Sequence, residues 1–147
     1  MAPAQIVREL LRLGLGGIFG YAGALKIWNV QQFALDVHHF ELTPWTVSLL
    51  VAVYLPWLEV LAGLALIARR TVPGASLAIA GMTLVFMVAL GSAWARGLDI
   101  SCGCFGKEEA AVKTDFLGLM LRDGALLAAA VWVFVAELRG TDGRRGQ

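Results

Sequence analysis

Two cysteines in the segment ISCGCFGK, Cys102 and Cys104, are separated by one glycine, and they are the only cysteines in the 147-residue chain. A disulfide requires Cα atoms about 5.5–6 Å apart, which is closer than residues two apart lie in an extended chain. The backbone must therefore turn, and Gly103 permits that turn. A ring this small is strained, and strained disulfides have the high reduction potentials of catalytic or regulatory pairs. The spacing predicts a reversible redox pair.

The same thiols also suit a soft metal ion. Two thiolates suffice for near-linear coordination of Hg(II) or Cu(I). Zinc normally takes four ligands, which only His38 and His39 are available to complete, so structural zinc is disfavoured. Binding or transport of a soft metal by Cys102, Cys104, His38 and His39 is the alternative to redox chemistry; otherwise the two histidines are solvated surface. A third interpretation makes the chain a non-catalytic membrane assembly subunit.

The composition indicates an integral membrane protein. Hydrophobic residues make up 59% of the chain and charged residues 16%, whereas a soluble domain averages about 45–50% and 25%. The net charge of +1 provides no basic field for a phosphate backbone, and aromatic and basic residues do not alternate as they do on a nucleic-acid platform. The lipid bilayer is therefore the expected partner, and nucleic acid is excluded.

Four windows have the length and the low charge of a transmembrane helix, which needs about 20 mainly apolar residues. They cover residues 6–28, 45–68, 72–95 and 116–136. The windows predict an all-α polytopic membrane protein, a bundle of four transmembrane helices. We expect one membrane domain over residues 1–139, followed by a disordered tail over 140–147 that is rich in glycine and charge.

The first window imitates a signal peptide, because a short apolar run ends in the small residues of Ala22-Gly23-Ala24. Two features favour a retained span. Lys26 follows the small residues directly, and a stripe of Gly16, Gly20 and Ala24 would let a neighbouring helix backbone approach closely.

The distribution of Lys and Arg predicts the orientation of the chain. The face with both termini collects seven such residues, namely Arg8, Arg12, Arg69, Arg70, Arg139, Arg144 and Arg145. The opposite face has four, namely Lys26, Arg96, Lys107 and Lys113. By the positive-inside rule both termini are cytoplasmic, and the cysteine loop lies outside, in a compartment that tolerates disulfides. The expected location is the inner membrane of a bacterium.

Besides Arg8 and Glu9 near the start of the first span, five charged residues fall within the predicted spans, where a charge at midspan costs about 2.5–3.5 kcal/mol on insertion scales. Each therefore needs a partner. Arg12 and Glu59 lie at similar depths and are expected to pair, and Lys26 is placed to meet Asp123. Arg122 would reach up toward the cysteine loop. These groups either pin the helices together or handle protons, and the residue pattern leaves both interpretations open.

Several segments together resemble the MauE branch of the DoxX-like membrane proteins, named for methylamine utilisation. They are GIFGYAGALK at residues 17–26, LPWLEVLAG at 55–63, CGCFG at 102–106 and the pair Arg122-Asp123. The resemblance implies a compact four-helix membrane bundle, similar in outline to vitamin K epoxide reductase and DsbB. Unlike those proteins, this sequence has neither a Cys-x-x-Cys motif nor a second cysteine pair.

The resemblance also implies a function. Proteins of this type are thought to help mature disulfide-rich extracytoplasmic enzymes beside a thioredoxin-like partner of the MauD kind. The resemblance assigns Cys102 and Cys104 as the redox pair, while Glu59, Arg122 and Asp123 match the family pattern without a settled role. The expected function is thus thiol–disulfide exchange with a thioredoxin-like partner, and recharging of the pair by a quinone is a further hypothesis.

Overall fold

The computed structural model describes residues 2–98 and 116–145, with side chains described as far as residue 140. Within these ranges there are five helices and no strand. They are α1 (Pro3–Trp28), α2 (Val30–His39), α3 (Trp45–Ile67), α4 (Val72–Ala95) and α5 (Phe116–Arg145). Four of them, α1, α3, α4 and α5, are long and apolar enough to cross a membrane. The predicted all-α fold with four spans is confirmed, and the chain is a multi-pass membrane protein.

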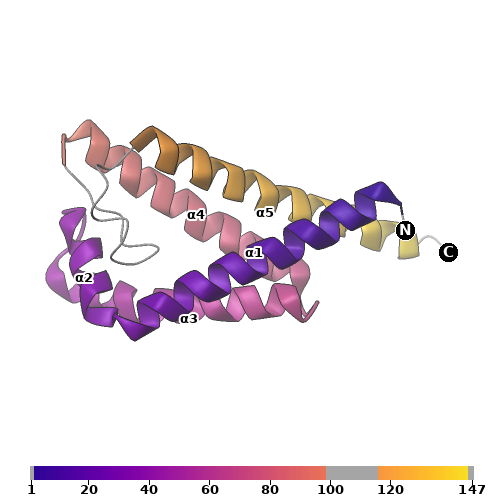
Figure 1. The fold of residues 1–147 in the computed structure, drawn as a ribbon, viewed down its shortest axis with the longest axis horizontal. Coiled ribbons are helices and arrows are strands. Elements are labelled where there is room, and N and C mark those ends of the chain that lie inside the picture. The colour runs from indigo at the N-terminus through magenta and orange to yellow at the C-terminus, as the bar shows by residue number, and fades with distance from the viewer. Residues whose placement is uncertain (1, 99–115, 146–147) are drawn as a thin grey trace.

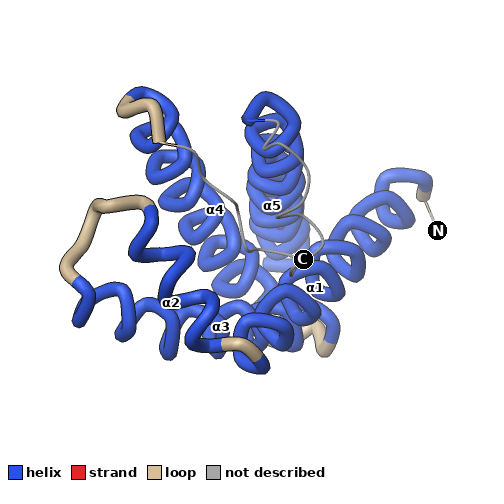
Figure 2. Tube along the Cα trace, turned by 60° about the vertical axis from the view of Figure 1, so that its left-hand side comes forward, coloured by secondary structure: helices blue, strands red, loops and turns tan. Residues whose placement is uncertain are grey.

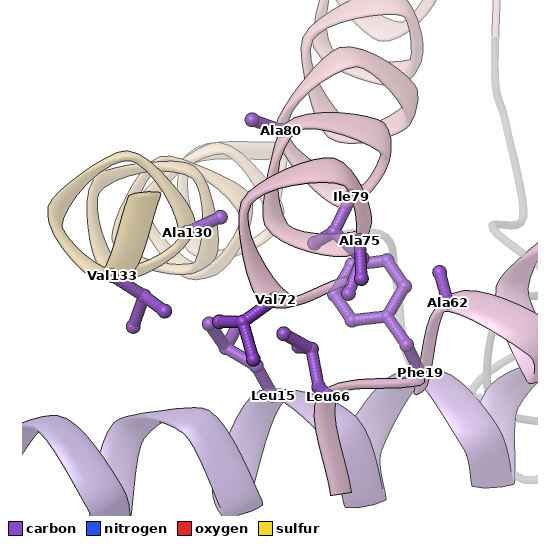
Figure 3. Packing of buried hydrophobic residues seen from close by; sticks show 10 residues of the cluster. All are labelled: Leu15, Phe19, Ala62, Leu66, Val72, Ala75, Ile79, Ala80, Ala130 and Val133. Carbon is purple, nitrogen blue, oxygen red and sulfur yellow. The ribbon is translucent and has the colours of Figure 1, made fainter. Parts of the chain in front are cut away.

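The four long helices run up and down in sequence order (Figure 1). The beginning of α1, the α3–α4 turn and the end of α5 lie at one end of the bundle, and α2 lies at the other. An ion pair between Arg8 of α1 and Glu137 of α5, 3.6 Å apart, links the two terminal helices. At the centre, Leu15, Phe19, Leu66, Ile79 and Val133 from all four long helices form one buried apolar cluster (Figure 3).

Helices α1 and α3 approach closely at three glycines. A Cβ atom built on Gly16 would lie 2.8 Å from the carbonyl oxygen of Gly63, and one built on Gly63 would lie 2.6 Å from the carbonyl oxygen of Gly16. A Cβ on Gly23 would lie 2.7 Å from the carbonyl oxygen of Pro56. The predicted close approach is confirmed, but Gly23 takes the place expected for Ala24, which is exposed. At about 100° per residue, a position seven residues after Gly16 stays on the same face and one eight residues after it does not.

The predicted connection between the first two spans contains the short helix α2, which lies across the ends of α1 and α3 (Figure 2). Its apolar residues Phe33 and Ala34 are buried and pack with Ala52 of α3. The apolar face explains why the segment folds as a helix at the end of the bundle, because that face must be covered.

The observed bounds differ from the expected ones mainly at the last helix. The first helix begins at Pro3, before the expected residue 6, and the second span ends at Ile67. Helix α5 continues past residue 136 to Arg145, through most of the segment for which the sequence predicts a disordered tail. Once a helix is formed, each further residue adds a hydrogen bond, and no proline interrupts this one. The single domain over residues 1–139 stays a prediction.

Candidate functional site

Two buried charges form an ion pair between α1 and α3. The Lys26 Nζ atom donates to Oε1 and Oε2 of Glu59 at 2.7 and 2.9 Å, and both side chains are 7% exposed. The ammonium also lies 4.9 Å from the centre of the Phe33 ring of α2. The site thus joins three helices through one cation, which gains both a carboxylate and an aromatic face.

The direction of side chains along a helix explains how these two residues meet. Because Cβ atoms tilt toward the amino end of their own helix, Lys26 reaches back toward Gly23 and Glu59 reaches back toward Pro56. The helices are antiparallel, and Gly23 contacts Pro56 directly. Both side chains therefore converge on the same level of the bundle, where the missing Cβ of Gly23 leaves room for them.

A second buried carboxylate belongs to Asp123 of α5. Its Oδ1 atom accepts a hydrogen bond of 3.1 Å from the Nε of the adjacent Arg122, and the residue is 4% exposed. Its Oδ2 atom is buried and has no hydrogen-bond partner within the described parts of the chain. A buried acceptor without a donor is costly to the folded state.

These groups surround one cavity of about 80 Å³ to which all five helices contribute. Its polar lining consists of Lys26, Glu59, Thr83, Arg122 and Asp123, and phenylalanines from α1, α2 and α4 complete the wall. The Thr83 hydroxyl donates to the carbonyl of Ile79 at 2.8 Å, so its oxygen can still accept. Two cations and two carboxylates around a small space can bind a polar molecule or pass a proton.

The structure contradicts the expected pair of Arg12 and Glu59. The Arg12 guanidinium binds the carboxylate of Glu9 at 2.7 Å and donates to the carbonyl oxygens of Leu66 and Ile67 at the end of α3. Glu59 lies about two helical turns before Leu66, which is roughly 10 Å along the axis. Equal depth along two helices does not make residues partners, and the register set by the Gly16–Gly63 contact places Arg12 opposite the end of α3.

The expected pair of Lys26 and Asp123 is also wrong, because Lys26 binds Glu59. Both residues nevertheless line the same cavity. Arg122 donates a hydrogen bond to Asp123, its neighbour in the sequence, at 3.1 Å. The assignment of Arg12, Lys26, Glu59, Arg122 and Asp123 as functional residues stays a prediction.

Cys102 and Cys104 lie outside the described residues, and so does any contact between Arg122 and the cysteine loop. The two flanks of this loop are described. The rings of Trp94 and Phe116 stack with centres 5.1 Å apart, and Arg96 donates to the carbonyl oxygen of Phe40. The chain thus leaves α4 and enters α5 at the end of the bundle that carries α2.

The two histidines lie at the end of α2. His39 is exposed, whereas His38 packs edge-on against Trp45, with ring centres 5.4 Å apart. His38 therefore contributes to packing, where the sequence suggested solvated surface. In residues 2–98 and 116–140, no group of three or more His, Cys, Asp and Glu side chains is placed to hold a metal ion. The soft-metal alternative depends on the two cysteines and stays untested.

Sequence reasoning missed Asp36 of α2, which is 6% exposed. Burial raises the pKa of its carboxyl, while the hydrogen bond from Gln32 and the charge of His39 act in the opposite direction. Asp36 also lines an apolar hollow of about 540 Å³ between α2, α3 and α4. The helical spacing of Phe33, Asp36 and Phe40 could have shown that the carboxylate shares the buried face of the helix.

Comparisons with known proteins agree with this architecture. The family model of methylamine utilisation protein MauE matches residues 4–136. The chain is 34% identical over 96 residues to the methylamine utilization protein MauE of Paracoccus denitrificans. That alignment covers 65% of this chain and 52% of the relative, so the chain spans about half the length of the curated relative it matches. No solved structure matches the chain.

The family match extends from the beginning of α1 to within the last turns of α5, so it includes all four membrane-spanning helices and the segment with both cysteines. This four-helix membrane protein belongs to the family of methylamine utilisation protein MauE.

Proposed function

We propose that this chain is a membrane thiol–disulfide redox protein. Its Cys102–Cys104 pair exchanges disulfides with a thioredoxin-like partner outside the cytoplasm and thereby supports the maturation of secreted proteins. The observation that carries the proposal is the Cys-Gly-Cys-Phe-Gly element, which contains the only two cysteines of a chain in the MauE family. The thioredoxin-like partner comes from the resemblance to that family.

The exchange proceeds in two balanced steps. A thiolate of the reduced partner attacks one sulfur of the Cys102–Cys104 disulfide, which forms a mixed disulfide and releases the other sulfur as a thiolate. The second thiol of the partner then attacks the mixed disulfide. The partner leaves oxidised to a disulfide, and Cys102 and Cys104 are left as a dithiol that has gained two electrons.

The position of the buried charges supports this proposal. Cys102 follows Leu98 by four residues in the sequence, and Leu98 packs at the end of the bundle that carries α2. Asp123 lies seven residues into α5, or about 10 Å along the axis from that end, and Lys26 lies two residues before the end of α1. The charged cavity is thus close to the helix ends that hold the cysteine loop, and it can supply or accept the protons that thiol chemistry exchanges.

Recharging by a membrane quinone fits the same proposal. Oxidation of the dithiol back to the disulfide transfers two electrons and two protons to the quinone, which becomes a quinol. The apolar hollow between α2, α3 and α4 is large enough for a quinone ring, and Asp36 contributes a carboxyl group to its lining. Because burial raises the pKa of Asp36, the carboxyl is held toward the protonated form that can donate a hydrogen bond to a quinone oxygen.

The decisive experiment traps the mixed disulfide. Mixed with the oxidised partner, the Cys102→Ser and Cys104→Ser variants each offer one thiolate that attacks the partner's disulfide, forms a mixed disulfide and releases the partner's other sulfur as a thiolate. Because the second cysteine of the chain is absent and cannot complete the exchange, one variant is expected to accumulate this covalent complex with the partner. The complex appears on a non-reducing gel and disappears with dithiothreitol. The double Ser variant is the control and forms none. Addition of a soluble quinone to the reduced wild type should restore the disulfide, and it should not do so in the double variant.

Two outcomes would overturn the proposal. Full maturation of secreted disulfide proteins in cells with the double Ser variant would show that the cysteines are dispensable and would favour the interpretation as a non-catalytic assembly subunit. Retention of Hg(II) or Cu(I) by the purified wild type, lost in the double variant and without any mixed disulfide, would favour the soft-metal alternative.

A further inference from the structure

An open groove of about 790 Å³ runs between the beginning of α1 and the second half of α5. Its wall on α5 extends from Gly124 to Arg139, and α1 contributes Ala4, Gln5 and Arg8. Between its ends the groove is apolar, with Leu127, Val131 and Val135 beside the small side chain of Ala128. Near the end of the bundle that carries the start of α1, the two helices are linked by the ion pair of Arg8 and Glu137.

The length of the groove matches one leaflet of a bilayer. Gly124 and Arg139 are fifteen residues apart in α5, which is about 22 Å at 1.5 Å per residue. Half of a hydrocarbon core about 30 Å thick is about 15 Å, and the headgroup region lies beyond it. A transmembrane helix of a partner would need an apolar seam across the whole core. This groove instead has the dimensions for an acyl chain that enters from one side.

The charges at the outer end of the groove favour an anion. Arg139 is exposed and has no ion-pair partner within the described residues. Arg8, on the opposite wall, meets only the more distant carboxylates of Glu137 at 3.6 Å and Glu9 at 3.9 Å. Trp132 also lines the groove and is 41% exposed, about 10 Å along α5 from Arg139. A tryptophan at that level is typical of the membrane interface, so Arg139 lies at the level of lipid phosphates.

From this geometry we infer that the groove binds one anionic phospholipid. An acyl chain lies along the apolar wall of α5, and the phosphate lies between the guanidinium groups of Arg8 and Arg139. Two arginines from different helices donate hydrogen bonds to the phosphate oxygens. In a zwitterionic lipid the cationic group of the headgroup would partly neutralise that phosphate, so an anionic lipid is preferred. The inference is independent of the cysteine pair.

Native mass spectrometry of the detergent-purified full chain tests the inference. The protein is mixed with equal amounts of phosphatidylglycerol and phosphatidylcholine that carry the same acyl chains, and we expect preferential retention of one phosphatidylglycerol. Arg139→Gln should lower the preference about fivefold, since an arginine near the membrane surface contributes about 1 kcal/mol. Arg139→Lys should retain most of it. Arg70→Gln removes an exposed arginine from the same end of the bundle but outside the groove, and it should change nothing.

A second measurement locates the acyl chain. Brominated phosphatidylglycerol should quench more tryptophan fluorescence in the wild type than in Trp132→Phe, because Trp132 lines the groove. Equal losses in the Arg139→Gln and Arg70→Gln variants would overturn the inference, as would displacement of the lipid by inorganic phosphate, which would indicate a site for free anions. A disulfide-linked dimer formed through Ala128→Cys would show that a second copy occupies the groove and would also overturn it.

Discussion

At the residue scale, the ion pair of Lys26 and Glu59 links α1 to α3. Each charge is held within the bundle by the other, and the Phe33 ring adds a third contact. A buried pair of this kind contributes little net stability compared with apolar side chains, but loss of one partner leaves the other charge unpaired. The pair therefore specifies how α1 and α3 face each other more than it strengthens their contact.

Substitution of one partner should be worse than substitution of both. Glu59→Gln or Lys26→Met should destabilise the protein by about 3–5 kcal/mol, because each substitution leaves the charge of the other residue buried without a counterion. The double variant Lys26→Met with Glu59→Leu should recover most of that loss. Thermal unfolding in detergent, followed by circular dichroism, measures all three. Additive losses in the double variant would contradict a direct coupling between the two residues.

The buried carboxyl of Asp36 predicts a pH dependence of stability. Burial raises its pKa above the ordinary value of 3.8. For an acid with a raised pKa, the favourable contribution is fully present below the ordinary value and is lost as the pH rises through the raised one, because ionisation of the buried group then opposes folding. Asp36→Asn cannot ionise, and its amide oxygen can still accept from Gln32.

The melting temperature of Asp36→Asn should therefore exceed that of the wild type near pH 7, and the difference should shrink toward pH 4. Melting curves of both proteins between pH 4 and pH 8 provide the measurement. A difference that does not vary with pH would show that Asp36 does not ionise with a raised pKa.

At the scale of elements, the contact between α1 and α3 depends on missing side chains. A Cβ added to Gly63 would meet only backbone atoms of Gly16 and Gly20, so there is no flexible side chain that could move away. One added to Gly16 would meet both the Gly63 carbonyl oxygen and the Ile67 side chain. In lipid no hydrophobic force drives helices together, so membrane helices associate through the van der Waals contacts that close approach of their backbones allows. It also sets the register that places Lys26 beside Glu59.

The substitution Gly63→Ala should therefore separate the helices. We expect a destabilisation of about 1–3 kcal/mol, the usual cost of overpacking, and a weakened ion pair. Gly17→Ala is the matched control, because a Cβ there meets nothing within 4 Å. The control should be neutral or slightly stabilising, since alanine favours helix more than glycine does. Equal unfolding temperatures for both variants would contradict the role assigned to the contact.

For the whole molecule, the up-and-down path of four spans puts the start of α1 and the end of α5 at the same end of the bundle, opposite the flanks of the cysteine loop. An excess of Lys and Arg at the terminal end predicts that this end is cytoplasmic. The two ends of the bundle would then face compartments of different redox state, and a disulfide would persist only on the outer side.

This orientation predicts the labelling of thiols in spheroplasts. A membrane-impermeant maleimide added outside should modify Cys102 and Cys104 after reduction. Arg139→Cys, in a chain whose native cysteines are replaced by serine, should react only after the membrane is permeabilised. The opposite pattern would show that the protein has the inverted orientation, with the cysteine pair outside the oxidising compartment.

The sequence by itself determined the four spans, because a run of about 20 apolar residues is a local property that needs no knowledge of neighbouring helices. The bounds of the third span, residues 72–95, agree with α4 at both ends. The same local reasoning identified the buried charges as residues that require partners, and it identified the glycines as a place of close approach. It also singled out the Cys-Gly-Cys element, which lies outside the described residues.

Only the tertiary structure decided which charges meet. The sequence predicts a pair of Arg12 and Glu59 because depth along a helix can be counted from the sequence, whereas rotation and register cannot. The contact of Gly16 with Gly63 places Arg12 opposite the carbonyl groups at the end of α3, and it leaves Glu59 to Lys26. The cavity of α1 to α5 and the burial of Asp36 follow from the same cause, since both arise where side chains distant in sequence converge in space.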